Sequence, residues 1–279
     1  MERGDYKLHS VKGYLSTLFI IEYQHGMLLP DCGAPGDVAR LESYCREVIG
    51  RPMTDIKLAM VSHMHPDHAG GAHLLRGRYG IPLAAHYGID GAYPGFAGLM
   101  QHKLERFMTR RMAQLRKMPR ESLRFPRMLH PDYRLYNGDP LPFFEDWQAF
   151  WIPGHTMFDM GIYHPSDRIL YVVDMFNEVK GRYFLPFQVL YHAEMEASIE
   201  RVSALGASKI MLAHGIGQNV MPMDPEQFLA LRDQVWLPPN RIARYVYRRT
   251  WLSPVWRDYR RQCRAEGKPV MPRGFFHMS

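Results

Sequence analysis

Four residues with metal-binding side chains lie close together in the pattern His63-x-His65-x-Asp67-His68. The pattern directly follows an apolar run, Ile56–Val61, which is typical of a buried strand. Two histidines two positions apart in an extended segment point the same way, so His63 and His65 can reach one cation. Asp67 and His68 follow where the chain turns into a helix, so they can face a second cation beside the first. Neutral imidazole and carboxylate groups are ligands that zinc, iron and manganese accept.

Further residues of ligand type occur in a similar context. His155, Asp174 and His214 each come shortly after a run with strand character, and Asp31 ends a fourth such run. A single histidine after a strand is more often structural than a ligand. Repetition of this context at several strand ends favours ligands, because residues at strand ends project into a cleft rather than into a core. The runs concerned are residues 147–152, 169–173, 209–212 and 26–29.

The elements that must position these residues alternate between strand and helix patterns in two batches. The batches flank residues 96–134, which predicts an α/β sandwich with this segment inserted between its halves. We expect a catalytic domain over residues 1–240, followed by a basic helical extension over 241–279 that packs on it.

The order of these residues resembles the motifs of the metallo-β-lactamase superfamily over about residues 10–220. The resemblance implies a four-layer αβ/βα sandwich with metals at one edge between the sheets. It also implies a role for each matching position. By it, the first metal is held by His63, His65 and His155, the second by Asp67, His68 and His214, and both by Asp174, with Asp31 orienting a ligand from behind.

The cofactors implied are two divalent metal ions, with zinc favoured and iron or manganese compatible with the same ligands. Two cations lower the pKa of a bridging water from about 15.7 toward 7, and so generate hydroxide at neutral pH. They also stabilise the oxyanion. We count Asp67 as catalytic as well as metal-binding. The sequence contains no Gly-x-Ser-x-Gly nucleophile motif.

Departures from the family's patterns narrow the choice among its branches, and hydrolysis of an ester, thioester or lactone bond is favoured. True β-lactamases of this fold usually carry Cys or Ser where Asp174 stands, so antibiotic hydrolysis is disfavoured. Flavodiiron proteins carry Glu where His65 stands, so oxygen reduction is disfavoured. Acyl-homoserine lactonases usually place Tyr at the position of Asn177, which disfavours that substrate. The run Gly181–Phe184 faintly resembles the glutathione-binding loop of glyoxalase II, which favours a thioester.

A methionine-rich stripe marks residues 96–118 as a helix, with Met100, Leu104, Met108 and Met112 on one face. One interpretation is a lid that lines an apolar entrance, since methionine adapts to varied acyl shapes. Packing on the protein's own core and a homodimer contact are the alternatives. Three residues are weaker candidates for orienting substrate, namely Arg182, Tyr183 and Tyr191.

The formal net charge of +7 is concentrated in two segments. Residues 103–134 hold ten basic and three acidic residues, and residues 241–273 hold ten and two. The rest of the chain is therefore acidic, which suits a cation site. Basic segments can attract an anionic substrate, nucleic acid or a membrane surface, or can simply be solvated helix faces.

Two further functions therefore stay open beside the hydrolase acting on a small molecule. One is a phosphodiesterase or nuclease of the same superfamily, although no nucleic-acid-binding module is evident. The other is a non-catalytic metal-binding scaffold, which the intact ligand set disfavours.

Composition favours a cytoplasmic protein. The three cysteines, Cys32, Cys45 and Cys263, are too few and too scattered for a disulfide framework. The first ten residues lack the apolar region of a secretory signal. No apolar run approaches the roughly 20 residues of a membrane span.

Overall fold

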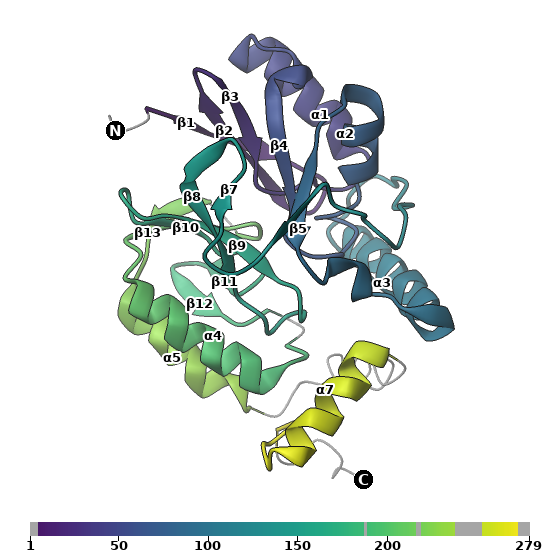
Figure 1. The fold of residues 1–279 in the computed structure, drawn as a ribbon, viewed down its shortest axis with the longest axis vertical. Coiled ribbons are helices and arrows are strands. Elements are labelled where there is room, and N and C mark those ends of the chain that lie inside the picture. The colour runs from purple at the N-terminus through teal and green to yellow at the C-terminus, as the bar shows by residue number, and fades with distance from the viewer. Residues whose placement is uncertain (1–4, 187–188, 216–218, 238–252, 273–279) are drawn as a thin grey trace.

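Two six-stranded β-sheets face each other, and helices cover the outer side of each sheet (Figure 1). This computed structural model of the chain describes residues 5–186, 189–215, 219–237 and 253–272. The layers confirm the predicted four-layer αβ/βα sandwich. Much of the apolar core lies between the sheets, where Phe19 and Met60 of the first sheet belong to the same cluster as Trp147 and Ile162 of the second.

The first sheet is antiparallel at its start and parallel from its third strand onward. Its strands, in spatial order, are β1 (Lys7–Lys12), β2 (Thr17–Tyr23), β3 (Gly26–Leu29), β4 (Ile56–Val61), β5 (Leu83–His86) and β6 (Tyr133–Leu135). Its outer face is covered by α1 (Asp37–Tyr44), which continues as a π-helical turn over Cys45–Ile49, and by α2 (Ala72–Tyr79).

Alternation of side chains between the two faces explains why the central strands β2, β3 and β4 are mostly apolar. In β2, Phe19 and Ile21 face the second sheet, whereas Leu18 and Ile20 pack toward the helices. A strand buried on both faces needs a continuous apolar run rather than an alternating one. The run Ile56–Val61 is such a strand, and it delivers the histidine motif to the end of the sheet.

The second sheet is antiparallel except where β10 pairs with β13. Its strands, in spatial order, are β14 (Val220–Pro222), β13 (Lys209–Met211), β10 (Ile169–Tyr171), β9 (Met160–His164), β8 (Phe144–Trp151) and β7 (Pro140–Leu141). It is covered by α4 (His192–Leu205) and α5 (Pro225–Val235), beside a small hairpin of β11 (Asn177–Val179) and β12 (Arg182–Phe184).

The inserted segment lies within the first half of the fold, not between the halves as predicted. Its helix, α3 (Gly95–Leu115), follows β5, and the chain then returns to the first sheet as β6. The short strand β6 was not anticipated, because three residues after Pro131 carry little periodic signal. Residues 133 and 134, predicted as part of the insertion, therefore belong to the sheet.

Other differences concern the ends of elements. The strand expected from Tyr14 begins at Thr17, and the helix expected from Ala69 begins at Ala72. Strand β1 was missed because most of its residues are exposed or half-buried. Of the predicted basic extension, α7 (Pro254–Ala265) is a helix, capped by the Ser253 side chain. Residues 241–252 and 273–279 lie outside the described residues.

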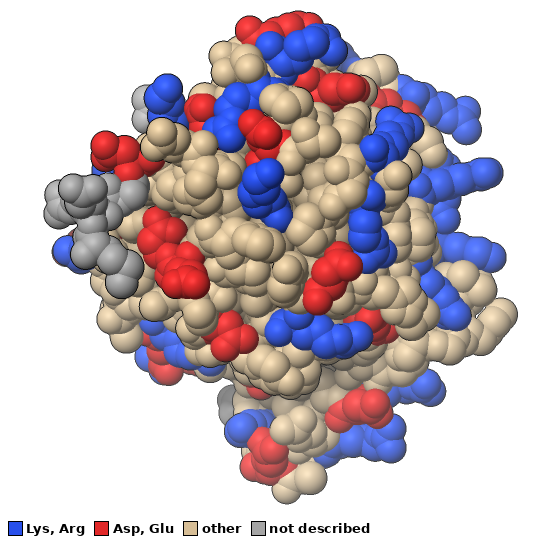
Figure 2. Space-filling view, turned by 45° about the horizontal axis from the view of Figure 1, so that its top comes forward, with Lys and Arg blue, Asp and Glu red and all other residues tan. Residues whose placement is uncertain are grey.

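Charge is unevenly distributed over the surface. Figure 2 shows one face, on which Lys and Arg side chains gather along the right-hand edge, the side on which Figure 1 places α2 and α3. Lys103, Arg111 and Arg116 of the insertion are exposed. Within the part of the chain that the structure describes, no helix combines the length and apolarity needed to cross a membrane.

Candidate metal centre

The predicted ligands all lie beyond the ends of strands at one edge of the sandwich. His63, His65, Asp67 and His68 follow β4 of the first sheet. The other three follow strands of the second sheet, with His155 after β8, Asp174 after β10 and His214 after β13. The structure brings these seven side chains together in two adjoining groups.

The first group consists of His63, His65, His155 and Asp174, whose ligand atoms lie within 4.8 Å of one another. Three ring nitrogens converge, because His65 Nδ1 is 2.9 Å from His63 Nε2 and 3.0 Å from His155 Nε2. Asp174 Oδ2 lies 3.5 Å from His155 Nε2 and 3.8 Å from His63 Nε2. Three imidazoles and a carboxylate form a donor set suited to a divalent transition metal.

The second group consists of Asp67, His68 and His214. The Nε2 atoms of His68 and His214 are 3.3 Å apart, and Asp67 Oδ2 is 3.5 Å from the latter. Asp174 Oδ1 lies 3.3 Å from both of these nitrogens. Asp174 thus directs one oxygen toward each group.

One unsatisfied atom of the site fits a metal ion. Asp174 Oδ1 is buried and accepts no hydrogen bond from the described residues. A buried carboxylate oxygen without a donor is costly unless a cation faces it. The two groups are therefore compatible with a dinuclear metal site.

The charge states of the groups differ. Burial, reinforced by the neighbouring histidines, holds the pKa values of His63 and His65 well below their usual range, so both rings stay neutral and keep a lone pair. Burial would raise the pKa of Asp174, but His68 and His214 outweigh it and hold that pKa well below its usual value. The same carboxylate, with Asp31 and Asp67, raises the pKa of His68 against its burial.

Asp31, predicted to orient a ligand from behind, sits under the second group. Its Oδ2 lies 2.6 Å from His68 Nδ1 and accepts hydrogen bonds from Ser62 Oγ at 2.6 Å and from the Tyr171 hydroxyl at 3.0 Å. Its Oδ1 accepts the Ser62 backbone N–H. Asp31 thus links β3, β4 and β10, and it turns His68 Nε2 toward the cluster.

The loop that carries His155 is shaped by close packing on α4. A Cβ atom on Gly154 would lie 2.7 Å from Met195 Cβ, so only glycine fits. The Gly154 carbonyl accepts the backbone N–H groups of Leu190 and Tyr191, each at 3.0 Å. Ser198 Oγ of α4 also donates to the Pro153 carbonyl at 2.7 Å. Close packing thus fixes where His155 points.

Two carboxylates beside the site were missed by sequence reasoning. Asp159 Oδ1 lies 3.9 Å from His63 Nδ1, and the same side chain accepts hydrogen bonds from the backbone N–H and hydroxyl of Thr156. Because Asp159 lies only four residues after His155, its closeness in sequence to a predicted ligand could have marked it as a candidate. Glu105 Oε2 lies 3.7 Å from His65 Nε2, and nothing in the sequence marks it, because it depends on how α3 packs.

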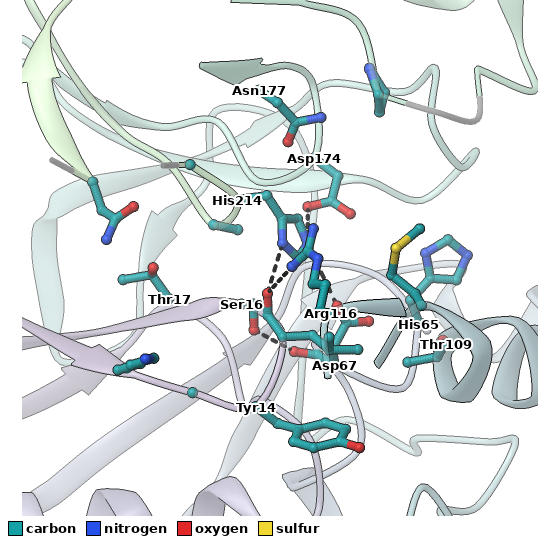
Figure 3. A pocket seen from close by; sticks show the side chains of 18 of the residues that line it. Tyr14, Ser16, Thr17, His65, Asp67, Thr109, Arg116, Asp174, Asn177 and His214 are labelled. Carbon is teal, nitrogen blue, oxygen red and sulfur yellow. Dashed lines mark hydrogen bonds and ion pairs between the residues drawn. The ribbon is translucent and has the colours of Figure 1, made fainter. Parts of the chain in front are cut away.

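A cavity of about 990 Å³ opens over both groups (Figure 3). The loop around Leu15, which connects β1 and β2, forms one side, and another side is formed by Met108 and Met112 of α3 and by Arg116 directly after it. Arg116 and His214 converge on one acceptor, since Arg116 Nη1 donates to the Leu15 carbonyl at 3.1 Å and His214 Nδ1 lies 3.2 Å from it.

The predicted substrate-contacting residues divide into those that line this cavity and those that do not. Met108 and Met112 line it, whereas Met100 and Leu104 do not, and Met100 is 42% exposed. Tyr191 instead lines a small separate cavity behind His65. The remaining two candidates belong to strand β12, where Tyr183 packs on Phe176 and Arg182 lies over the Phe184 ring.

Comparison with known proteins gives the same fold. A family model described as the metallo-beta-lactamase superfamily matches residues 12–214. No curated protein matches the chain. A metallo-beta-lactamase family protein from Thermus thermophilus superposes with a TM-score of 0.60 at 18% identity, covering 94% of each chain.

Two other solved structures are similarly distant in sequence. An archaeal superfamily protein from Sulfolobus tokodaii gives a TM-score of 0.59 at 15% identity, covering 91% of this chain and 98% of that one. The metallo-beta-lactamase FIM-1 from Pseudomonas aeruginosa, solved in a mono-zinc form, gives 0.53 at 16% identity, covering 80% and 85%. Because the family model spans most of the chain, the protein belongs to the metallo-beta-lactamase superfamily.

Proposed function

We propose that the protein is a dinuclear metal-dependent hydrolase that acts on an ester, thioester or lactone bond of a small molecule. The observation that carries this proposal is Asp174, which directs one carboxylate oxygen toward each ligand group beneath an open cavity. His63, His65 and His155 would hold one ion, and Asp67, His68 and His214 the other. Zinc is favoured for both, and iron or manganese suits the same donors.

Two bound cations would supply the nucleophile by lowering the pKa of a water molecule, and would polarise the carbonyl of the substrate. The residues of this chain set the conditions for that chemistry. Asp67 lines the cavity beside His214, so its carboxylate can accept a hydrogen bond from the water. Asp31 and the Leu15 carbonyl hold the outer nitrogens of His68 and His214 and thereby fix both rings.

A protein nucleophile is not required and is not favoured. Cys32 follows Asp31 in sequence but is fully buried, and burial raises the pKa of its thiol well above the usual value. The thiol therefore stays protonated and inert at neutral pH.

The cavity wall supports an acyl substrate. Val11, Leu15, Met108 and Met112 give it apolar surface, and methionine side chains adapt to chains of different shape. Lys12 and Arg116 also line the cavity, and these two cations are the observation that favours the second candidate, a phosphodiesterase.

A substrate panel on enzyme of measured metal content tests both candidates. The panel comprises p-nitrophenyl esters, thioesters, lactones and bis-p-nitrophenyl phosphate. Turnover of acyl substrates that is lost with a chelator and restored by zinc supports the proposal. Turnover confined to the phosphodiester supports the second candidate. Two bound ions without turnover of any substrate class would instead support a non-catalytic metal-binding scaffold.

A further inference from the structure

The two ring nitrogens of His65 face different surroundings. Nδ1 points into the cluster, at 2.9 and 3.0 Å from the nitrogens of His63 and His155. Nε2 points the other way, toward the carboxylate of Glu105 on α3 at 3.7 Å. A neutral imidazole carries one proton, and the nitrogen that binds a metal must be the other one. If Nδ1 is the ligand atom, the proton belongs on Nε2, which faces the Glu105 carboxylate at ion-pair distance.

Glu105 is itself held firmly in this place. Its side chain is 8% exposed. The Tyr93 hydroxyl donates to Glu105 Oε2 and also lies 2.7 Å from the carbonyl of Met64, the residue next to His65. Gln101, one turn earlier on α3, donates to Glu105 Oε1 at 2.8 Å. A carboxylate fixed by two donors has little freedom to leave the histidine.

We propose that Glu105 is a positioning residue that orients His65 and fixes its tautomer for metal binding. The inference rests on the proposed metal centre, and it assigns a role to the insertion that the superfamily fold alone does not supply. Two other histidines have carboxylate partners from other parts of the fold. Asp31, just after β3, contacts His68, and Asp159, in the loop before β9, lies beside His63. The partner of His65 comes from the helix inserted between β5 and β6.

The far side of this pair is closed by the C-terminal helix. A cavity of about 30 Å³ behind His65 and Glu105 is lined by Tyr191 and by Ser253 and Val255 at the start of α7. That volume suits a single water molecule. Both side chains also line the main cavity but are only 14% and 8% exposed, and this burial strengthens an interaction between a carboxylate and an imidazole N–H.

The test compares Glu105→Gln with Glu121→Gln. Both change a carboxylate of the insertion into an amide, but Glu121 pairs with Arg40 of α1 and not with a histidine. Zinc affinity is measured by competition with a chromophoric chelator. The visible absorption of the cobalt-substituted protein reports the geometry around the ion. Glu105→Asp tests whether a shorter carboxylate rescues binding.

For Glu105→Gln we expect one of the two ions to bind about 10–100-fold more weakly, with an altered cobalt spectrum and the second ion unchanged. Partial recovery in Glu105→Asp, and wild-type affinity in Glu121→Gln, complete the expected result. A folded Glu105→Gln protein with wild-type affinities and spectrum overturns the inference. So does an equal loss in Glu121→Gln, because that loss would come from a loosened insertion. If the wild-type protein binds no metal, the proposed function itself fails.

Discussion

The carboxylate of Asp174 is the residue on which the proposed centre depends most. It is buried, its pKa is held low by two histidines, and its two oxygens reach different ligand groups. Each of the six other side chains belongs to one group only. Loss of its charge should therefore affect both ions at once, whereas loss of any histidine should affect one.

We expect Asp174→Asn to bind both ions at least tenfold more weakly and to lose about 100-fold in kcat. An amide keeps the volume of the side chain but lacks the charge and one of the two acceptor oxygens. Metal content after dialysis and kcat at saturating zinc provide the measurements. Asp258→Asn, on the exposed face of α7, is the control and should match the wild type. Undiminished stoichiometry in Asp174→Asn would contradict a shared ligand.

A second residue-scale prediction concerns His102, which packs between Tyr93 and Phe125 and has a buried Nε2 without a partner among the described residues. Burial, with Arg106 and Arg127, lowers the pKa of His102 to about 4. Between that value and about 6.5, the unfolded chain binds more protons than the folded one, so stability falls as pH falls through this window.

Metal-free His102→Phe should therefore lose less stability than the wild type between about pH 6.5 and about pH 4.5. Denaturant unfolding at several pH values provides the measurement. Other buried histidines, such as His86 and His192, titrate in both proteins and cancel in the comparison. If the free energy of unfolding changes with pH in the same way for both proteins, His102 does not contribute to the pH dependence in this range.

At the scale of elements, α3 has two distinct sides beyond its buried one. Met108 and Met112 face the cavity, whereas Phe107 is 57% exposed to solvent. The helix therefore agrees with the lid interpretation only in part. Met108 and Met112 line the entrance as a lid would, whereas Met100 belongs neither to the cavity wall nor to the two main core clusters.

Replacing both Met108 and Met112 with alanine should reduce the preference for long acyl chains. Loss of contact with two substrate methylenes, at about 0.8 kcal/mol each, lowers kcat/KM for a long ester by roughly tenfold. An acetyl ester is too short to reach these side chains and should change little. The control is Met100→Ala on the same helix. An equal fall for short and long esters would mean that the wall does not contact the acyl chain.

Sequence alone predicted the layers, and which His and Asp side chains lie together, far better than the surroundings of those side chains. Apolar runs that end at His63 or Asp174 follow directly from local pattern, and so do the strands that carry them. Glu105 and the closing contacts of Ser253 depend on how distant helices pack, which no local period encodes. The short strand β6 was not predicted for the same reason, because it pairs with β5 across the whole insertion.

At the scale of the whole molecule, each proposed ion would join the two sheets. The first group takes His63 and His65 from the first sheet and His155 from the second, and the second group joins His68 to His214 in the same way. Ligands from both halves are in place only in the folded chain, so binding energy adds to folding energy. At a zinc concentration about 100-fold above the dissociation constant, each ion contributes about 2.7 kcal/mol to the free energy of unfolding.

We expect a chelator to lower the thermal midpoint by roughly 10 °C or more, since about 1 kcal/mol corresponds to roughly 2–4 °C for a chain of this size. Calorimetry with and without the chelator measures this difference, and the Asp174→Asn variant should show a much smaller one. Identical midpoints for a protein that demonstrably holds two ions would mean that the sheets pack fully without them.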